Sequence, residues 1–235
     1  MPFLLALLLA VPAHQKAPAP AQPPAPAKAT APANATAPAN ATAPARALAG
    51  RVQSFYAHTK DFSARFDQHY TYLAMGRIED SAGAVQVKKP GAVRWDYDKP
   101  DKRTLFVQGK TLWIWRPDDQ EAQVKRDFGG DQLSSAFTFL WGKGDLLKEF
   151  SPRVVACPGE LPKGEALELR PLKPSGGVEK LLFVVGKDGQ VLASVVVNPQ
   201  GDINQIVFSD PKVDQGLPDS LFHFEPPKGV FVQEF

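Results

Sequence analysis

Short strand-like segments follow one another through most of this chain, with only tight turns between them. Residues 103–108 and 111–115 flank the two-residue break Gly109-Lys110, and residues 181–185 and 191–197 flank a Gly-containing turn. Strands joined by so few residues must pair antiparallel. About ten strands in series predict a large antiparallel meander that curls into a barrel or half-barrel. The other expected strands are residues 62–66, 85–87, 93–97, 122–126, 154–157, 167–169 and 203–208.

Two N-terminal segments lie outside this pattern. Residues 3–11 are almost wholly apolar, too short for a membrane span but suited to the apolar part of a secretory signal. No Lys or Arg precedes them, which is atypical, yet we interpret residues 1–13 as a signal peptide. Residues 14–44 are rich in Ala and Pro and contain the repeat ATAPAN, so they predict a disordered tether. The folded domain is then expected over residues 45–235.

Helical periodicity is present in three places. Residues 45–56 carry Leu48, Val52 and Phe55 near helical spacing. A short helix is also expected around Leu146 and Leu147, with Phe150 continuing its apolar stripe. Between these two, an expected helix with Asp131 as its N-cap presents one apolar face, made of Leu133, Ala136, Phe137, Leu140 and Trp141. Such an insertion in a mostly β chain is expected to cover an apolar surface.

Several strands are apolar on both faces. In residues 111–115, Trp113 and Trp115 point one way, while Leu112 and Ile114 point the other. An antiparallel strand with one solvated face would alternate apolar and polar residues, so these strands are expected to be covered on both sides. A filled core and a cavity lined with aromatic rings are both compatible with this pattern.

The sequence offers no set of catalytic residues. Its four histidines and the single Cys157 form no metal-ligand spacing, and it has neither a G-x-S-x-G motif nor a phosphate-binding Gly-rich loop. The net charge of +2 gives no reason to expect nucleic acid as a partner. We therefore expect a binding protein rather than an enzyme, without metal or cofactor.

Four segments carry a resemblance to a known family. They are FSARFDQ at 62–68, VKKPGAVRW at 87–95, PDKRTLFVQGKTLWIW at 100–115 and LFHFEPPKGV at 221–230. Together with the apolar insertion near residues 137–140, they resemble the LolA family of periplasmic carriers of outer-membrane lipoproteins. The resemblance covers the chain from about residue 45 to its end.

The resemblance implies a mainly β (α+β) fold, an incomplete antiparallel β-barrel with a helical lid over a hydrophobic cavity. It implies a periplasmic carrier, expected to be a monomer, that takes the acyl chains of lipoproteins from an inner-membrane ABC-transporter release complex. The carrier would then pass its cargo to an outer-membrane acceptor, without a cofactor of its own. A carrier or sensor of this fold for another hydrophobic ligand, such as a glycolipid or other lipid, is the alternative.

The resemblance also assigns roles to individual residues. Lys89 stands where the family usually has an arginine that holds the lid closed, and a lysine would clasp backbone carbonyls less firmly. A solvated turn cation is the alternative interpretation of Lys89. The residues expected to line the cavity and the lid are Phe66, Val93, Trp95, Tyr97, Phe106, Trp113, Trp115, Leu133, Phe137, Phe139, Leu140 and Trp141.

Overall fold

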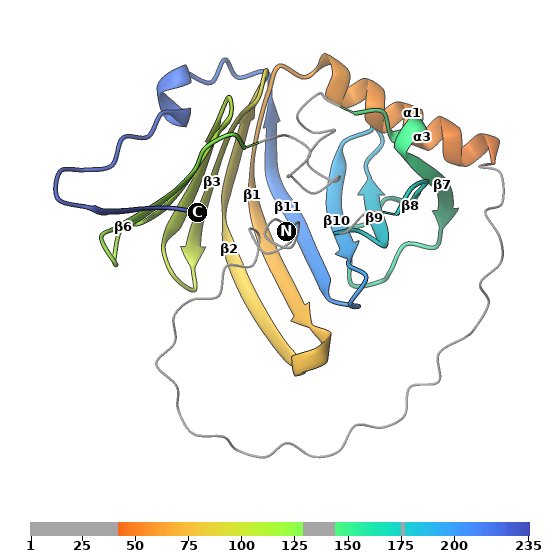
Figure 1. Ribbon diagram of the computed structural model, residues 1–235. Helices are drawn as coiled ribbons and strands as arrows, with labels where there is room; N and C mark the ends of the chain where they lie inside the picture. Colours follow the sequence, from red (N-terminus) through yellow and green to blue (C-terminus); the bar gives the residue numbers. More distant parts are fainter. Residues whose placement is uncertain (1–41, 129–143, 175–176) are drawn as a thin grey trace.

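A computed structural model describes residues 42–128, 144–174 and 177–235 of the protein. Strands dominate these residues, and the helices are few (Figure 1). The elements are α1 (Ala43–His58), β1 (Asp61–Tyr72), η1 (Leu73–Met75), β2 (Arg77–Lys88), β3 (Ala92–Lys99), β4 (Arg103–Gln108), β5 (Thr111–Arg116), β6 (Glu121–Lys125), α3 (Leu146–Glu149), β7 (Phe150–Val155), β8 (Glu165–Pro171), β9 (Lys180–Val185), β10 (Val191–Val197), β11 (Ile203–Val213), η3 (Asp219–Phe222) and β12 (Phe231–Glu234).

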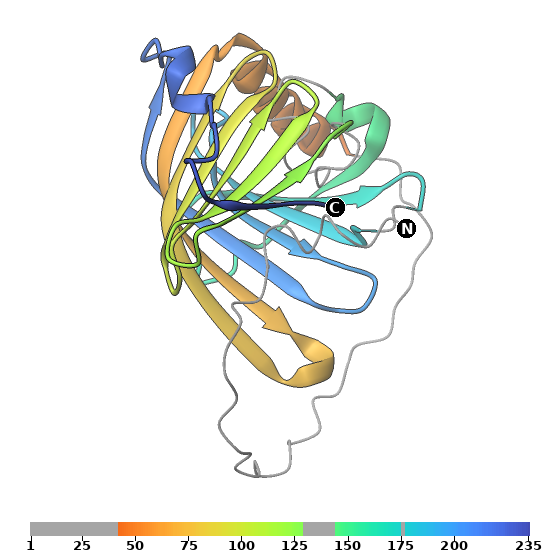
Figure 2. The same cartoon turned by 60° about the vertical axis from the view of Figure 1, so that its left-hand side comes forward.

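Twelve strands form one curled sheet in the order β12-β6-β5-β4-β3-β2-β1-β11-β10-β9-β8-β7 (Figures 1 and 2). The order is open-ended within the described residues, which confirms the predicted incomplete barrel. Two meanders, β1 to β6 and β7 to β11, meet at a seam where β1 pairs antiparallel with β11 and Phe66 lies opposite Phe208. The expectation of one continuous meander is corrected here, because β6 and β7 follow each other in the chain but lie in different halves of the sheet.

The edge strand β12 was not predicted from the sequence. Its four residues run parallel to β6, with Phe231 opposite Glu121 and Glu234 opposite Val124. A parallel pair cannot be joined by a tight turn. Here β7 to β11 and the C-terminal segment lie between β6 and β12 in the chain. The sequence pattern gives no sign of this pairing, since four exposed residues are too few to show an alternation.

Helix α1 is amphipathic and packs on one face of the sheet. Pro44 fits its first turn, where the missing N–H is not needed. The Thr59 hydroxyl donates to the Phe55 carbonyl at 2.9 Å where the helix ends. Its buried residues recur at helical spacing, namely Ala45, Leu48, Ala49, Val52 and Tyr56. They pack with apolar side chains of β8, β9 and β10, among them Leu167, Leu181 and Phe183. We call this face of the sheet the inner face and the opposite one the outer face.

The outer face is covered in two places, which explains the strands that are apolar on both sides. On β9 and β10, Val184 and Ala193 are completely buried and pack with Leu161 of the loop after β7. On β4 and β5, the ring of Phe224 from the C-terminal segment packs against the sheet. The sequence prediction of two-sided coverage is therefore confirmed, and chain segments outside the sheet provide the outer cover.

The predicted helices and strands agree with most observed elements. α1 begins at Ala43, two residues before the predicted start of the folded domain, and β4 and β5 flank Gly109-Lys110 as expected. The short helix α3 contains Leu146 and Leu147, but Phe150 begins β7 and does not continue the helix. Asp145 marks the beginning of this four-residue helix, because its carboxylate accepts a hydrogen bond from the Leu147 N–H at 3.0 Å.

Candidate functional site

Three aromatic rings lie against one another on the inner face of β1 and β3. The ring centroid of Phe66 is 4.9 Å from that of Trp95 and 5.2 Å from that of Tyr97. Phe66 lies opposite Gly83 of β2, which in turn lies opposite Tyr97, so the missing side chain of Gly83 leaves room for the Phe66 ring. Val93 is partly buried and packs against the same cluster. These four predicted cavity residues are therefore brought together.

The apolar surface extends across both meanders. Ring contact between Tyr56 of α1 and Phe62 of β1, at 6.4 Å, joins the α1 side to the β1–β3 side. Phe208 packs against the buried residues of both sides. Other buried members on the β1–β5 side are Ala64, Val85, Val87, Leu105, Val107, Leu112, Ile114, Phe128 and Ile206. The inner face thus presents one continuous apolar surface.

Three other predicted cavity residues lie on the outer face. Phe106 is paired with Arg94, whereas Trp95 is paired with Leu105, so Phe106 and Trp95 point to opposite sides of the sheet. Phe106, Trp113 and Trp115 surround Phe224, with centroid distances of 4.9, 5.5 and 5.7 Å. The sequence predicted that all seven cavity residues on the strands share one cavity, and this expectation is corrected. Phe106, Trp113 and Trp115 lie on the other face and contact the C-terminal segment.

The predicted lid lies outside the described residues. Its members Leu133, Phe137, Phe139, Leu140 and Trp141 all belong to residues 129–143. Their role over the cavity, and any contact between them and Lys89, stays a prediction from the sequence.

The inner face becomes polar toward the turn between β1 and β2. Gln68 donates to the Asn204 side-chain oxygen at 2.8 Å, and both residues are buried. The Arg103 guanidinium lies 4.0 Å above the ring of Tyr97. Burial raises the pKa of the Tyr97 hydroxyl to about 12, although the neighbouring Arg103 charge acts in the opposite direction. The face therefore offers an apolar half near α1 and a half with polar groups near the β1–β2 turn.

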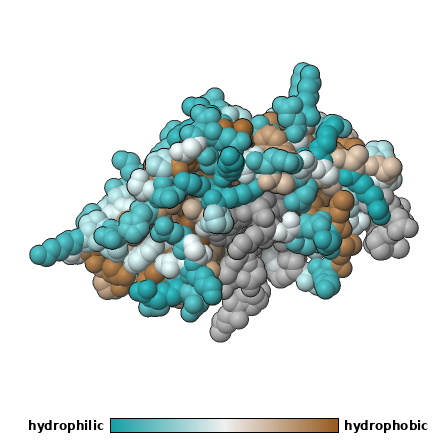
Figure 3. Space-filling model, turned by 90° about the horizontal axis from the view of Figure 1, so that it is seen from above, coloured by the Kyte–Doolittle hydropathy of each residue, from teal (hydrophilic) through white to brown (hydrophobic). Residues whose placement is uncertain are grey.

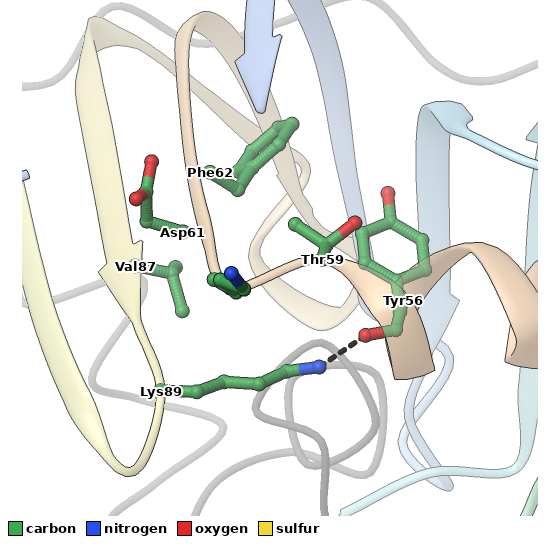
Figure 4. Close-up of a pocket in the computed structure, with 7 residues that line it drawn as sticks. Tyr56, Thr59, Asp61, Phe62, Val87 and Lys89 are labelled. Carbon is green, nitrogen blue, oxygen red and sulfur yellow. Dashed lines mark hydrogen bonds between the residues drawn. The ribbon is translucent and has the colours of Figure 1, made fainter. Parts of the chain in front are cut away.

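The basic corner at the end of β2 contacts both covers of the sheet. The Lys89 ammonium donates to the Tyr56 carbonyl at the C-terminal end of α1 (Figure 4). Lys88, whose side chain points the other way, donates to the Leu217 carbonyl at 2.7 Å and to the Asp219 carboxylate at 2.6 Å. One corner thus holds α1 on the inner side and the C-terminal segment on the outer side.

The environment of Lys89 is partly apolar. Burial lowers the pKa of its ammonium group below the usual value, while the Asp214 carboxylate acts to raise it. The helix C-terminus carries partial negative charge on its free carbonyls, so a cation is stabilised there. The Lys89 ammonium group therefore is not only solvated, because it donates a hydrogen bond to α1.

A small pocket opens beside this contact. Its space is about 240 Å³, including open solvent at its mouth, and Figure 4 shows Lys89 reaching along it toward α1. It is lined by Tyr56, Thr59, Lys60, Asp61, Phe62, Val87 and Lys89. Seen from the α1 end of the molecule, hydrophobic residues lie in patches between hydrophilic ones (Figure 3). The pocket lies where α1, β1 and the basic corner meet.

Asp61 is the structurally important residue that sequence reasoning missed. Its buried carboxylate accepts from the backbone N–H groups of Gln215, Gly216 and Leu217, at 2.8, 2.9 and 3.3 Å. These partners lie more than 150 positions away in the chain, so no local pattern could have indicated them. Asp61 fixes the beginning of the C-terminal segment to the end of the α1–β1 turn.

The described residues hold no group of three or more His, Cys, Asp and Glu side chains that could bind a metal ion. None of the helices in that part of the chain is long and apolar enough to cross a membrane. In these residues the apolar inner face is covered by α1, and the C-terminal end of α1 accepts a hydrogen bond from the Lys89 ammonium group.

Comparison with known sequences gives consistent matches. The family model described as outer membrane lipoprotein carrier protein LolA matches residues 57–225. An outer-membrane lipoprotein carrier protein of Chromobacterium violaceum is 33% identical over 184 residues, which cover 77% of this chain and 85% of that protein. A protein of the same name from Nitrosospira multiformis is 26% identical over 183 residues, covering 78% and 86%.

Solved structures give weaker similarities. A LolA superfamily protein of Nitrosomonas europaea has a TM-score of 0.42 and 13% identity, with 77% of this chain and 97% of that chain covered. The crystal structure of MucB has a TM-score of 0.46 and 15% identity, with 80% and 65% covered.

Proposed function

Since this chain belongs to the LolA family of outer membrane lipoprotein carrier proteins, we propose that it binds the acyl chains of lipoproteins on its inner face and carries them between membranes. The donor would be an ABC-transporter release complex of the inner membrane, and the recipient an acceptor at the outer membrane. The protein would act in the periplasm, to which the apolar N-terminal segment would direct it, and would need no cofactor.

The observation that carries this proposal is the continuous apolar inner face. It joins the ring cluster around Phe66 to the residues under α1 through Phe208, which packs against both groups. Each methylene group of an acyl chain contributes about 0.8 kcal/mol when it leaves water, so a chain of about 16 carbons represents about 12 kcal/mol. A soluble carrier has to offer an apolar surface of this kind if lipoproteins are to cross an aqueous compartment.

Release requires that the cover of this surface can be moved. α1 is held by packing, by the bond from Lys89 to Tyr56, and by the Val191 N–H, which donates to the Tyr56 hydroxyl at 3.2 Å. The apolar segment at residues 131–141 would add the lid predicted from the sequence. A carrier with covers held by a few polar contacts can exchange an empty closed state for a loaded open one.

The direct test is a transfer experiment. The purified mature protein is incubated with membranes that retain newly made lipoproteins, and the soluble fraction is analysed for a complex with acylated cargo. We expect a soluble complex, and we expect no complex with cargo that lacks its acyl chains. If the folded protein binds a free fatty-acid probe but forms no complex with lipoprotein, the fold serves another hydrophobic ligand and the proposal is wrong.

Substitution of Lys89 tests how the cover is held. In Lys89→Leu the bond to the Tyr56 carbonyl is lost, so the closed empty state is less favoured and less free energy is needed to open it. A hydrogen bond from a charged group contributes about 1.5–3 kcal/mol, and solvent reduces this at a partly exposed site. We expect roughly a 3- to 10-fold tighter binding of a fluorescent acyl probe.

Lys89→Arg is the matched variant, because it keeps the charge and a donor. We expect its probe affinity to stay within about twofold of that of the unchanged protein. Equal affinities for all three proteins would show that Lys89 does not hold the cover. Unfolding curves of the variants distinguish a change in the cover from a general loss of stability.

A further inference from the structure

Exposed apolar side chains gather at the turn between β1 and β2. Leu73 and Met75 of η1 are 60% and 67% exposed, and Ile78 at the start of β2 is 56% exposed. Ile203 of β11 is 36% exposed and lies beside them. We call these four residues the apolar tip. Scattered exposed apolar residues are normal on a protein surface, but a contiguous group at one place indicates a contact surface.

Strand register places the two isoleucines of the apolar tip on the same face, close to the turn. Thr71 of β1 lies opposite Ile78 on one side and opposite Ile203 on the other, so the two isoleucines flank one residue on the outer face. Leu73 and Met75 follow Thr71 at the turn itself. Figure 2 shows that the β1–β2 hairpin extends beyond the neighbouring strands. The tip is therefore a convex protrusion at the far end of the sheet from the Lys89 corner.

The turn that presents the tip is braced by contacts with the neighbouring turn. The Leu73 N–H donates to the Asp202 carboxylate at 2.9 Å, which ties the turn to the neighbouring β10–β11 turn. Gly76 has a φ of 58° and donates to the Leu73 carbonyl at 3.3 Å, closing η1. A side chain at Gly201 would lie 2.6 Å from Leu73 Cδ2, so Leu73 packs closely on that turn. Binding through the tip would therefore not have to order a flexible loop.

Acidic side chains outnumber Lys and Arg around the tip, where Asp202 and Asp80 accompany the Arg77–Glu79 pair. Arg77 forms an ion pair with Glu79 at 3.3 Å and lies 4.3 Å above the Tyr72 ring. The Nδ1 atom of His69 lies 2.5 Å from an Asp80 carboxylate oxygen. Attraction to anionic lipid headgroups depends on clusters of Lys and Arg, and the tip has no such cluster among the described residues. Its surface is suited to uncharged apolar material.

We propose that the apolar tip inserts reversibly into the interface of a lipid bilayer, and so docks this end of the carrier on a membrane. A bilayer receives a convex apolar protrusion without shape complementarity, whereas a protein partner would need a fitting pocket. The exposed apolar side chains of the tip are Leu, Met and Ile, which need no specific partner to leave water. The proposal is independent of the identity of the cargo.

The expected binding is weak. A single 14-carbon acyl chain gives an association constant of only about 10⁴ M⁻¹ with membranes. Three or four partly inserted side chains bury less apolar area than such a chain, so a smaller constant is expected. A carrier that visits two membranes has to leave each of them, and weak docking permits this.

Vesicle flotation with the full mature chain tests the proposal. Vesicles of phosphatidylcholine alone, at millimolar lipid, should carry a detectable fraction of the cargo-free protein. This fraction should be nearly the same between about 0.05 M and about 0.5 M salt, because the contact is not electrostatic. The double variant Leu73→Ser with Met75→Ser should float at least about fivefold less.

A matched control removes similar apolar area elsewhere. Val154 and Leu172 are 42% and 55% exposed on the β7–β8 side of the sheet, so Val154→Ser with Leu172→Ser should float like the unchanged protein. Equal flotation of the tip and control variants would overturn the proposal. The absence of flotation by the unchanged protein would also overturn the proposal. If, in addition, the tip variant took cargo from membranes more slowly, the tip would be assigned to a protein partner.

Discussion

Gly83→Ala should lower the free energy of unfolding by about 3–5 kcal/mol or prevent folding altogether. A Cβ atom at Gly83 would lie 1.8 Å from the Asp96 carbonyl oxygen and 3.0 Å from Phe66 Cε1. Neither neighbour can retreat easily, because one is backbone of the adjacent strand and the other is a ring packed against Trp95 and Tyr97. Urea denaturation followed by tryptophan fluorescence measures the effect.

Gly50→Ala is the control for this substitution. Gly50 lies inside α1, and an added Cβ would meet nothing within 4 Å. Alanine in a helix interior is more favourable than glycine by about 0.5–1 kcal/mol, so this variant should be slightly more stable than the unchanged protein. A loss of less than about 1 kcal/mol in Gly83→Ala would show that β2 and β3 are not so close at this position.

Asp61→Ala should cost about 3–5 kcal/mol of stability, the second large effect. The substitution leaves three backbone N–H groups, those of Gln215, Gly216 and Leu217, without the carboxylate that they now share. Hydrogen bonds to a charged group contribute more than neutral ones, and a buried donor left without an acceptor adds its desolvation cost. Thermal unfolding would report the loss, and hydrogen exchange should show it most strongly at residues 214–219.

Two further variants define the cause. Asp61→Asn keeps one acceptor oxygen and should lose less stability than Asp61→Ala. Asp80→Ala removes an exposed carboxylate whose partner is His69, and a surface pair of this kind contributes about 1 kcal/mol or less. If Asp61→Ala were as mild as Asp80→Ala, the three hydrogen bonds would not be holding the C-terminal segment in place.

Local sequence patterns were enough to predict most individual elements. The alternation in residues 62–66 predicts the start of β1, and Gly109-Lys110 predicts the β4–β5 hairpin, in which Val107 lies opposite Leu112. The spacing of Leu48 and Val52 predicts α1. In each case a short stretch contains both the periodicity and the residue that ends the element.

Which face each aromatic side chain occupies was harder to predict. Alternation shows that Trp113 and Leu112 point in opposite directions, but not which of them points toward α1. That depends on the register between β3 and β4, where Trp95 lies opposite Leu105, and on Phe224, which reaches the outer face from far along the chain. The role of Asp61 depends on equally distant partners. Such features follow from the tertiary structure and leave no local signal.

The seam between β1 and β11 has a consequence for how the chain reaches its native state. Phe62 pairs with Val213, so β1 has to wait for a strand about 150 residues later before its second edge is satisfied. The N-terminal part of the chain is synthesised first, so β1 to β6 can form their hairpins while β11 is still unfolded. Until then β1 presents an open edge and an uncovered apolar face, a combination that favours aggregation. We therefore expect refolding to be limited by closure of the seam, and we expect the incomplete chain to need protection from aggregation until β11 has paired with β1.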